Sequence, residues 1–201
     1  MKRAALKTTR QWLRDPHEWY VEESRASDAL FDVERFVGGI WDPACGRGNI
    51  VEAARSAGYT GVIGSDLIKR VDAPWHIGEI DFLNAPLEPF PGSIVTNPPF
   101  YRGQGTERFI RRAIGLGASK VAVFVSLSFL AGHKRATGLF VDHPPARVYV
   151  ITPRVSCPPG EWLLAGNRAG GGAEDWCWMV FDQTAPRMTT TFHWLNTKAL
   201  A

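Results

Sequence analysis

Short apolar runs alternate along most of the chain with longer segments of mixed polarity. Seven runs have strand-like length and β-branched content, at residues 38–41, 60–66, 76–80, 93–96, 121–125, 147–151 and 176–181. Segments 18–36, 50–57 and 106–116 carry apolar residues at near-helical spacing, and 128–140 predicts a helix or a turn. Strands that alternate with helices predict an α/β domain with an open, mainly parallel sheet and helices on both faces.

The pattern also predicts the domain organisation. A single domain is expected over residues 18–201, preceded by a basic N-terminal segment at 1–17. Residues 152–174 are rich in glycine and proline and predict one long irregular loop, which is unusual inside a domain and is often functional. With Arg154 and Arg168 in it, this loop is our candidate for contacting a substrate.

Composition narrows the class of protein only slightly. The 201 residues are 45% hydrophobic and 21% charged, as in ordinary soluble proteins. No apolar run reaches the length of a membrane span and no signal peptide is evident, so a cytoplasmic protein without membrane contact is expected. The net charge of +3 permits binding to a polyanion without requiring it. Basic residues cluster at 2–14, at 108–112 and at 134–135.

The cysteines give no sign of metal binding. Cys45, Cys157 and Cys177 are not in a Cys-x-x-Cys spacing, and no histidine lies at a metal-ligand interval from them. We therefore expect buried free thiols and no metal site.

The first chemical motif, Asp42-Pro43-Ala44-Cys45-Gly46-Arg47-Gly48, follows the first predicted strand. Its glycines allow a sharp turn and a close ligand approach, and Asn49 is expected to cap the helix that follows. A dinucleotide-binding loop would have a third glycine where Val51 stands. The acidic residue at the strand end instead suits a cationic ligand.

Two more acidic positions follow predicted strands. Asp66 lies 20 residues after Gly46, where a carboxylate can accept hydrogen bonds from ribose hydroxyls. Asp81 could accept a proton from an adenine amino group while Phe82 packs against the ring. Together with the glycine loop, these positions predict a nucleoside site at the carboxyl ends of the strands.

The strongest motif is Asn97-Pro98-Pro99-Phe100, after the fourth strand. The two prolines stiffen the loop and remove two backbone donors. The Pro98 carbonyl and the Asn97 side-chain oxygen are then two fixed acceptors that can hold an –NH2 group, and Phe100 can stack on a flat ring. The motif therefore predicts chemistry on a planar amino nitrogen.

On these motifs the chain resembles the class I amino-methyltransferases, specifically the small adenine-specific DNA methyltransferases of phage and prophage type. The resemblance implies a Rossmann-like sheet of seven strands with the last antiparallel, and S-adenosylmethionine as cofactor. It implies catalysis by the tetrapeptide Asn97, Pro98, Pro99 and Phe100. It also implies the cofactor-binding residues, which are Tyr20, Asp42, Pro43, Ala44, Gly46, Gly48, Asp66, Leu67, Asp81, Phe82 and Asn97.

The chain departs from the family pattern at its N-terminal segment. Residues 21–23 replace the family's Thr-Pro, so only Tyr20 carries over as a residue that covers the cofactor. Trp194 resembles the aromatic residue that closes the family's last strand.

The implied reaction is methyl transfer to the N6 amino group of adenine in DNA. It requires no strong general base, because the nitrogen becomes acidic once methylated. The same tetrapeptide also serves guanine-N2 methylation in ribosomal RNA and glutamine-N5 methylation in proteins, and both substrates remain open. So does an inactive nucleic-acid-binding module on the same fold. A chain this short is expected to have low sequence specificity or to use a homodimer or a specificity partner.

Overall fold

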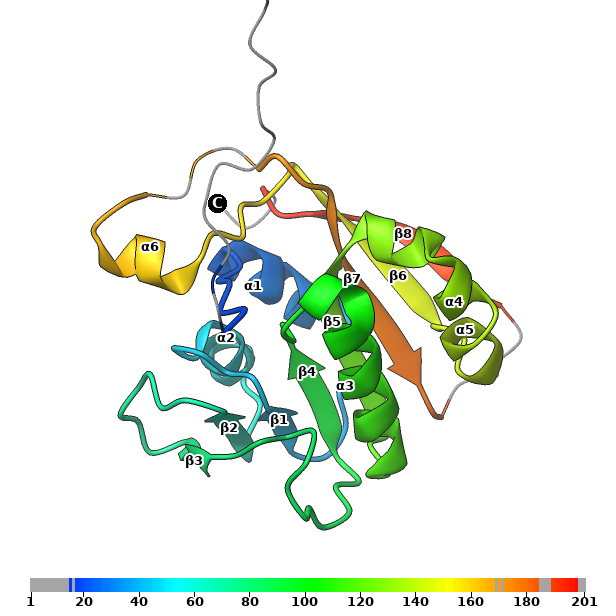
Figure 1. The fold of residues 1–201 in the computed structure, drawn as a ribbon, viewed down its shortest axis with the longest axis horizontal. Coiled ribbons are helices and arrows are strands. Elements are labelled where there is room, and N and C mark those ends of the chain that lie inside the picture. The colour runs from blue at the N-terminus through cyan, green and yellow to red at the C-terminus, as the bar shows by residue number, and fades with distance from the viewer. Residues whose placement is uncertain (1–14, 16, 169, 171, 185–188, 199–201) are drawn as a thin grey trace, which may run out of the picture.

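An eight-stranded sheet forms the centre of the molecule (Figure 1). The computed structural model describes residues 15, 17–168, 170, 172–184 and 189–198, so the predicted basic segment 1–17 lies almost wholly outside the described residues. In spatial order the strands are β3 (His76–Glu79), β2 (Val62–Asp66), β1 (Ile40–Asp42), β4 (Ser93–Thr96), β5 (Lys120–Ser126), β7 (Trp176–Asp182), β6 (Arg147–Thr152) and β8 (Thr191–Asn196).

The strand directions confirm the mainly parallel sheet and correct the number of strands. Strands β1 to β5 are parallel to one another, and β7 is antiparallel to both β5 and β6. The prediction of seven strands is wrong, because β8 adds a further strand parallel to β6. Strand β8 was not among the predicted strands; only its Leu195 is buried, and Trp194 is 78% exposed. Trp194 therefore does not close a core.

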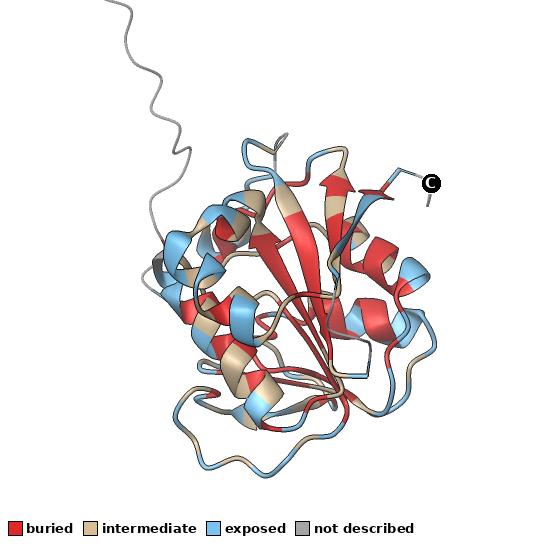
Figure 2. Ribbon diagram, turned by 90° about the vertical axis from the view of Figure 1, so that its right-hand side faces the viewer, coloured by how far each residue is buried: buried red, intermediate tan, exposed pale blue. Residues whose placement is uncertain are grey.

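Helices cover both faces of the sheet, as predicted. One face packs against α1 (Ser24–Val33) and α2 (Asn49–Ser56), and the other against α3 (Gln104–Gly115) and α5 (Leu139–Asp142), with α4 (His133–Ala136) next to α5. Strand β5 shows why two cores form: Val121, Val123 and Val125 point to the α3 side, and Ala122 and Phe124 to the α1 side. The buried strands lie between the two helical layers (Figure 2).

Three local predictions differ from the structure. Helix α1 begins at Ser24 and not at residue 18, because residues 19–23 are extended and pair with residues 158–160. Asn49 is the first residue of α2, and Gly48 occupies the N-cap position. The predicted irregular loop contains α6 (Gly160–Leu164), and its residues 155–160 are buried. Short 3-10 helices at Tyr101–Gly103 and Leu127–Ala131 complete the described elements.

A buried ion cluster ties α1 to the sheet. Arg147 donates to the Glu34 carboxylate at 2.6 Å and to Asp182 at 2.6 Å, and the Lys120 ammonium lies 2.7 Å from Glu34. Burial opposes ionisation of Asp182, but the hydrogen bonds from Arg147 and Thr184 prevail and lower its pKa to about 2. No helix in the described part of the chain is long and apolar enough to cross a membrane.

Candidate active site at the carboxyl ends of the parallel strands

The glycine loop turns tightly between β1 and α2. Gly46 and Gly48 have φ angles of +53° and +94°, in the left-handed region that favours glycine. The Cys45 N–H donates to the Ser65 carbonyl, which fixes the loop against the end of β2. The Asp42 carboxylate accepts from the Ala44 N–H at 3.1 Å. The loop therefore has the sharp turn that the sequence predicted.

Asp66 lies beside this loop and already has partners. Its carboxylate accepts from the Gly46 N–H at 2.8 Å and forms an ion pair with Arg70 at 2.7 Å. The side chains of Asp66 and Arg70 are each only 11% exposed. A ribose at this carboxylate would therefore compete with Arg70.

The extended segment 19–23, which we call the N-terminal strap, covers the glycine loop. A Cβ atom at Gly46 would come within 2.7 Å of the Trp19 indole nitrogen, and the Arg70 guanidinium lies 4.6 Å from the centre of the Trp19 ring. The strap is held in place by the Val21 N–H, which donates to the Pro158 carbonyl. Beneath it a cavity of about 20 Å³ remains. The strap thus fills most of the space that the loop encloses.

Two carboxylates in this cavity are buried without a cation within ion-pair distance among the described residues. Glu22 is 5% exposed and Asp42 is 1% exposed. Burial raises the pKa of Glu22 to about 7, although a hydrogen bond from Asn97 opposes the shift. Burial also raises the pKa of Asp42 well above its usual value, and the charges of Glu22 and Asp66 add to the effect. In the described part of the chain these groups do not converge as metal ligands would.

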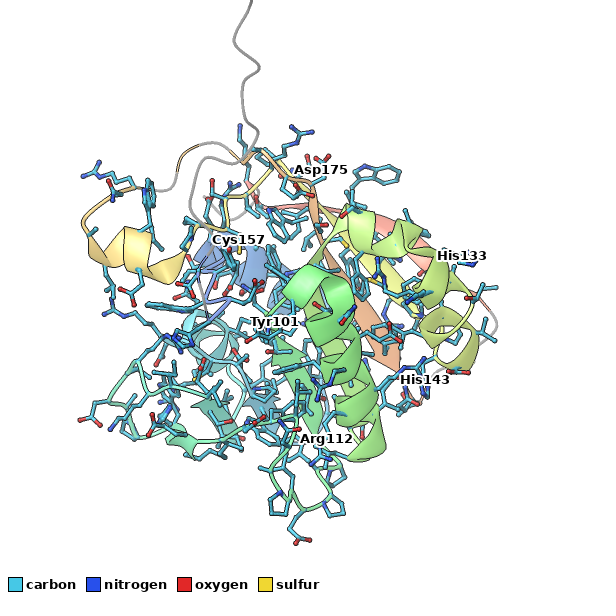
Figure 3. The ribbon with its side chains drawn as sticks, in the orientation of Figure 1. Tyr101, Arg112, His133, His143, Cys157 and Asp175 are labelled. Atoms are coloured by element: carbon cyan, nitrogen blue, oxygen red, sulfur yellow. The ribbon has the colours of Figure 1, made fainter. Side chains whose placement is uncertain are left out.

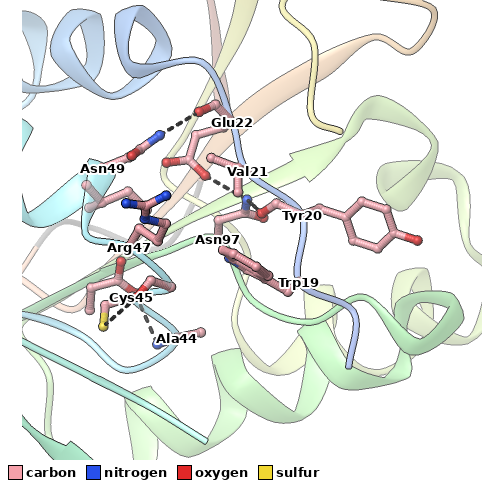
Figure 4. Close-up of a pocket in the computed structure, with 12 residues that line it drawn as sticks. Trp19, Tyr20, Val21, Glu22, Ala44, Cys45, Arg47, Asn49 and Asn97 are labelled. Carbon is pink, nitrogen blue, oxygen red and sulfur yellow. Dashed lines mark hydrogen bonds between the residues drawn. The ribbon is translucent and has the colours of Figure 1, made fainter. Parts of the chain in front are cut away.

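The Asn97 side chain is held by its amide nitrogen (Figure 4). Its Nδ2 donates to the Tyr20 carbonyl at 2.9 Å and to the Glu22 carboxylate at 2.7 Å, and the Cys157 sulfur lies 3.7 Å away. Among the described residues no donor reaches the Asn97 Oδ1 atom or the Pro98 carbonyl. Both acceptors of the tetrapeptide therefore remain available.

Aromatic rings line the outer side of the tetrapeptide. The Phe100 ring stacks against Tyr20, with 5.8 Å between ring centres, and lies 5.6 Å from Trp176. Trp176 in turn stacks on Phe124 at 4.8 Å. Tyr20, Phe100 and Trp176 are all half-buried, which suits a surface on which a planar group can stack.

The structure brings together some of the predicted site residues and separates others. Tyr20, Asp42, Ala44, Gly46 and Asn97 line the cavity, Asp66 lies against Gly46, and Pro98, Pro99 and Phe100 follow Asn97 directly. Asp66, Pro98, Pro99 and Phe100 adjoin the cavity without lining it, and the other predicted residues that do not line it are Pro43, Gly48, Leu67, Asp81 and Phe82.

Four of the predicted residues that do not line the cavity lie in a different structural environment. Gly48 faces Trp75, whose ring a Cβ atom would approach to 2.3 Å. Leu67 is 55% exposed. The Asp81 carboxylate caps a local turn through the Leu83 and Asn84 N–H groups, and Phe82 packs between Trp41 and Phe109 in the core on the α3 side.

Five residues near the site were missed by sequence reasoning: Trp19, Glu22, Arg70, Cys157 and Trp176. A signal existed for Trp176, because an antiparallel strand begins at the edge where its parallel neighbours end, and Trp176 is opposite Ser126, the last residue of β5. Trp19 belongs to the strap, and Cys157 directly precedes segment 158–160, with which the strap pairs. Both residues reach the site through this pairing between distant parts of the chain. Cys45, Cys157 and Cys177 are free and buried, which confirms that prediction (Figure 3 shows Cys157).

The mostly parallel, Rossmann-like sheet with an antiparallel β7 agrees with what the resemblance implied, with β8 added at the edge beside β6. No protein-family model and no curated protein sequence matches the chain. Solved structures share its fold. A Pyrococcus horikoshii protein, provisionally described as an RNA methyltransferase, has a TM-score of 0.54 at 13% identity, covering 79% of this chain and 80% of its own.

Two further structures are similarly close. A Lactococcus lactis protein, provisionally described as a hemolysin, gives a TM-score of 0.53 at 12% identity over 88% of this chain and 92% of its own. An O-methyltransferase predicted from Agrobacterium tumefaciens gives 0.52 at 15% identity over 86% and 85%. At these identities the comparisons establish only a fold shared with these structures, two of which are described as methyltransferases, and leave the activity to be argued from the site.

Proposed function

We propose that this chain transfers a methyl group from S-adenosylmethionine to the exocyclic amino nitrogen of adenine in DNA. The observation that carries the proposal is the Asn97 side chain. Its Nδ2 is engaged by Tyr20 and Glu22, so its Oδ1 is directed away from them, and no described donor reaches that oxygen. An oxygen held in this way beside the Pro98 carbonyl suits an –NH2 group with two hydrogens to donate.

The chain's own residues account for the acceptor half of the reaction. Asn97 Oδ1 and the Pro98 carbonyl accept the two amino hydrogens, which localises the nitrogen lone pair that is otherwise delocalised into the ring. Phe100 and Trp176 provide the faces on which a base can stack. A base in duplex DNA has to leave the helix to reach this position, at a cost of a few kcal/mol.

The cofactor half rests on the chemistry of the glycine loop. S-adenosylmethionine, when bound, supplies an electrophilic methyl group on a sulfonium centre. The buried carboxylate of Asp42 suits a cationic ligand, and Asp66 suits ribose hydroxyls. A small-molecule pocket measures roughly 300 Å³ or more. The 20 Å³ cavity therefore accepts a nucleoside only if the Trp19 side chain moves aside. The polar groups fit the cofactor, and the strap decides access to them.

A polyanionic substrate is supported by the surface beside the tetrapeptide. Helix α3 begins four residues after Phe100 and exposes Arg108, which has no ion-pair partner among the described residues. Arg111 on the same helix is ion-paired with Glu107 and Asp142. Arg112, toward the far end of α3, donates to the Ala85 carbonyl (Figure 3). In the loop after β6, residues 161–168 are half-buried or exposed. These surfaces are where we place the contacts to the phosphate backbone.

A labelling experiment tests the proposal. The protein is incubated with radiolabelled S-adenosylmethionine and, separately, with DNA, ribosomal RNA and a cell protein extract, and the modified species is identified after digestion. N6-methyladenine from DNA is the expected product, and the Asn97→Ala variant should yield none. Label in guanine of RNA or in glutamine of protein would change the assigned substrate and leave the assignment of the site unchanged. Wild-type activity of Asn97→Ala would overturn the site assignment, and absence of label in all three would favour an inactive binding module.

A further inference from the structure

We infer that Glu22 is a positioning residue, which orients the amide of Asn97 so that its oxygen and not its nitrogen faces the methyl acceptor. This inference rests on the proposed function and adds to it a residue outside the tetrapeptide. The carboxylate Oε2 of Glu22 accepts from Asn97 Nδ2 at 2.7 Å across 75 residues of sequence.

The geometry explains why a carboxylate at this place orients an amide. An asparagine amide presents an acceptor on one side and two donors on the other, and half a turn of the group exchanges them. The Tyr20 carbonyl and the Glu22 carboxylate both accept hydrogen bonds and donate none, so together they select the orientation in which Nδ2 points toward them. Oδ1 is then directed to the open side. In the reverse orientation Oδ1 would face two acceptors.

Glu22 is itself fixed by its surroundings. It is 5% exposed and belongs to the N-terminal strap, and the Asn49 side chain of α2 donates to its backbone carbonyl at 3.0 Å. This contact ties the strap to the helix that follows the glycine loop. The orienting group therefore couples the covering of the cofactor loop to the geometry of the tetrapeptide.

Protonation of Glu22 should release this control. A neutral carboxyl group carries a donor and could bond to Oδ1 instead, and its pKa of about 7 places the change near neutral pH. The titratable groups around it are Asp42 from β1 and Cys157 from the segment after β6, and Arg47 lines the same cavity. Asp42 and Cys157 also have raised pKa values. Ionisation of Glu22 and ionisation of Asp42 therefore oppose each other. We expect kcat to rise with pH through about 7.

Two substitutions separate orientation from charge. Glu22→Gln keeps an oxygen that can accept from Asn97, and Glu22→Ala removes it. Loss of a hydrogen bond to a charged group changes a rate or equilibrium constant by roughly 10- to 100-fold. Glu22→Ala should therefore lower kcat by at least tenfold, and it should change the Kd for S-adenosylmethionine by less. Glu22→Gln, like the protonated acid, can also present a donor to Oδ1, so its kcat should stay near the low-pH value of the wild type and should not rise near pH 7. Glu23→Gln, which removes a charge from the same strap without touching Asn97, is the matched control and should stay within a few-fold of wild type.

The outcomes distinguish this inference from the proposed function. If Asn97→Ala is inactive while Glu22→Ala keeps wild-type kcat, Glu22 does not position the amide and the proposed function stands. If Glu22→Gln is as impaired as Glu22→Ala, and both raise the cofactor Kd more than they lower kcat, Glu22 binds the cofactor charge instead. If Asn97→Ala is active, the site assignment itself fails.

A measurement on the unmodified protein keeps the test decisive if Glu22→Ala does not fold. The side-chain NH2 resonance of Asn97, assigned with Asn97→Ala, should shift with pH at a midpoint near 7 because its partner titrates there. A resonance that does not move between pH 5 and pH 9 would overturn the inference.

Discussion

Moving the carboxylate of the Glu22–Asn97 contact from residue 22 to residue 97, in two steps, tests the role of charge in this contact. The first change is Asn97→Asp. Here it would place two carboxylates with their nearest atoms about 2.7 Å apart. At an effective dielectric constant of about 20, two unit charges at that separation repel by roughly 6 kcal/mol, which corresponds to about four pH units of pKa displacement.

The pair should therefore retain one proton at neutral pH. A carboxyl group whose folded-state pKa is raised contributes fully to stability below its unfolded pKa near 4, and that contribution is lost as pH rises toward the folded pKa. Asn97→Asp should match wild type most closely near pH 4 and become progressively less stable by pH 8. Urea unfolding at several pH values measures this difference, and methyl transfer should fall at least tenfold.

The second change, Glu22→Gln in the Asn97→Asp background, supplies a new donor. The side-chain amide introduced at position 22 can donate to the aspartate, which restores one of the two bonds that fix residue 97. Rescue should be partial, because the Tyr20 carbonyl loses its donor and faces a carboxylate. If Asn97→Asp alone keeps wild-type stability at pH 8, or if the second substitution recovers neither stability nor activity, the reasoning about this contact is wrong.

Four further outcomes follow from the structure. Glu22→Gln alone should raise the free energy of unfolding by up to about 3 kcal/mol at pH 8 and by little at pH 4. The reason is that the pKa of the Glu22 carboxyl rises from 4.5 to about 7 on folding, so its ionisation costs stability above pH 4.5. Equal effects at both pH values would contradict the raised pKa. Asp182→Asn should cost up to about 2 kcal/mol at neutral pH, a difference that disappears as pH falls from 3.8 through about 2, since the native carboxylate has the lowered pKa; urea unfolding between pH 2 and pH 7 measures it. Trp19→Ala should lower stability by roughly 3 kcal/mol yet tighten S-adenosylmethionine binding measured by calorimetry, because it empties the space above Gly46; weaker binding would mean that the indole contacts the ligand. Thiol reagents at pH 8 should label the native protein far more slowly than the unfolded one, because burial raises the pKa of all three thiols, Cys45, Cys157 and Cys177.

The local sequence determined most of the sheet and the two loops at its edge. Strand-forming runs and the residues that end them are short-range properties, so β1 to β7 and the turns at Gly46 and Asn97 could be predicted from neighbours in the chain. The placement of Asp42 and Asn97 in one cavity followed as well, since the carboxyl ends of parallel strands meet at one edge. Strand β8 was missed although Thr191, Phe192 and Trp194 are residue types typical of strands, and only the fold shows that it pairs with β6 at the edge of the sheet.

The tertiary structure alone decided which polar groups are engaged and which remain available. No periodicity relates Glu22 to Asn97 or Trp19 to Gly46; these contacts exist because the strap pairs with residues 158–160 and is pressed onto the glycine loop. The same packing assigns Phe82 to the core and leaves Asp66 paired with Arg70. A motif specifies the chemical groups that a site contains. The protonation and orientation of those groups depend on burial and on partners distant in sequence, and both arise only when the chain is folded.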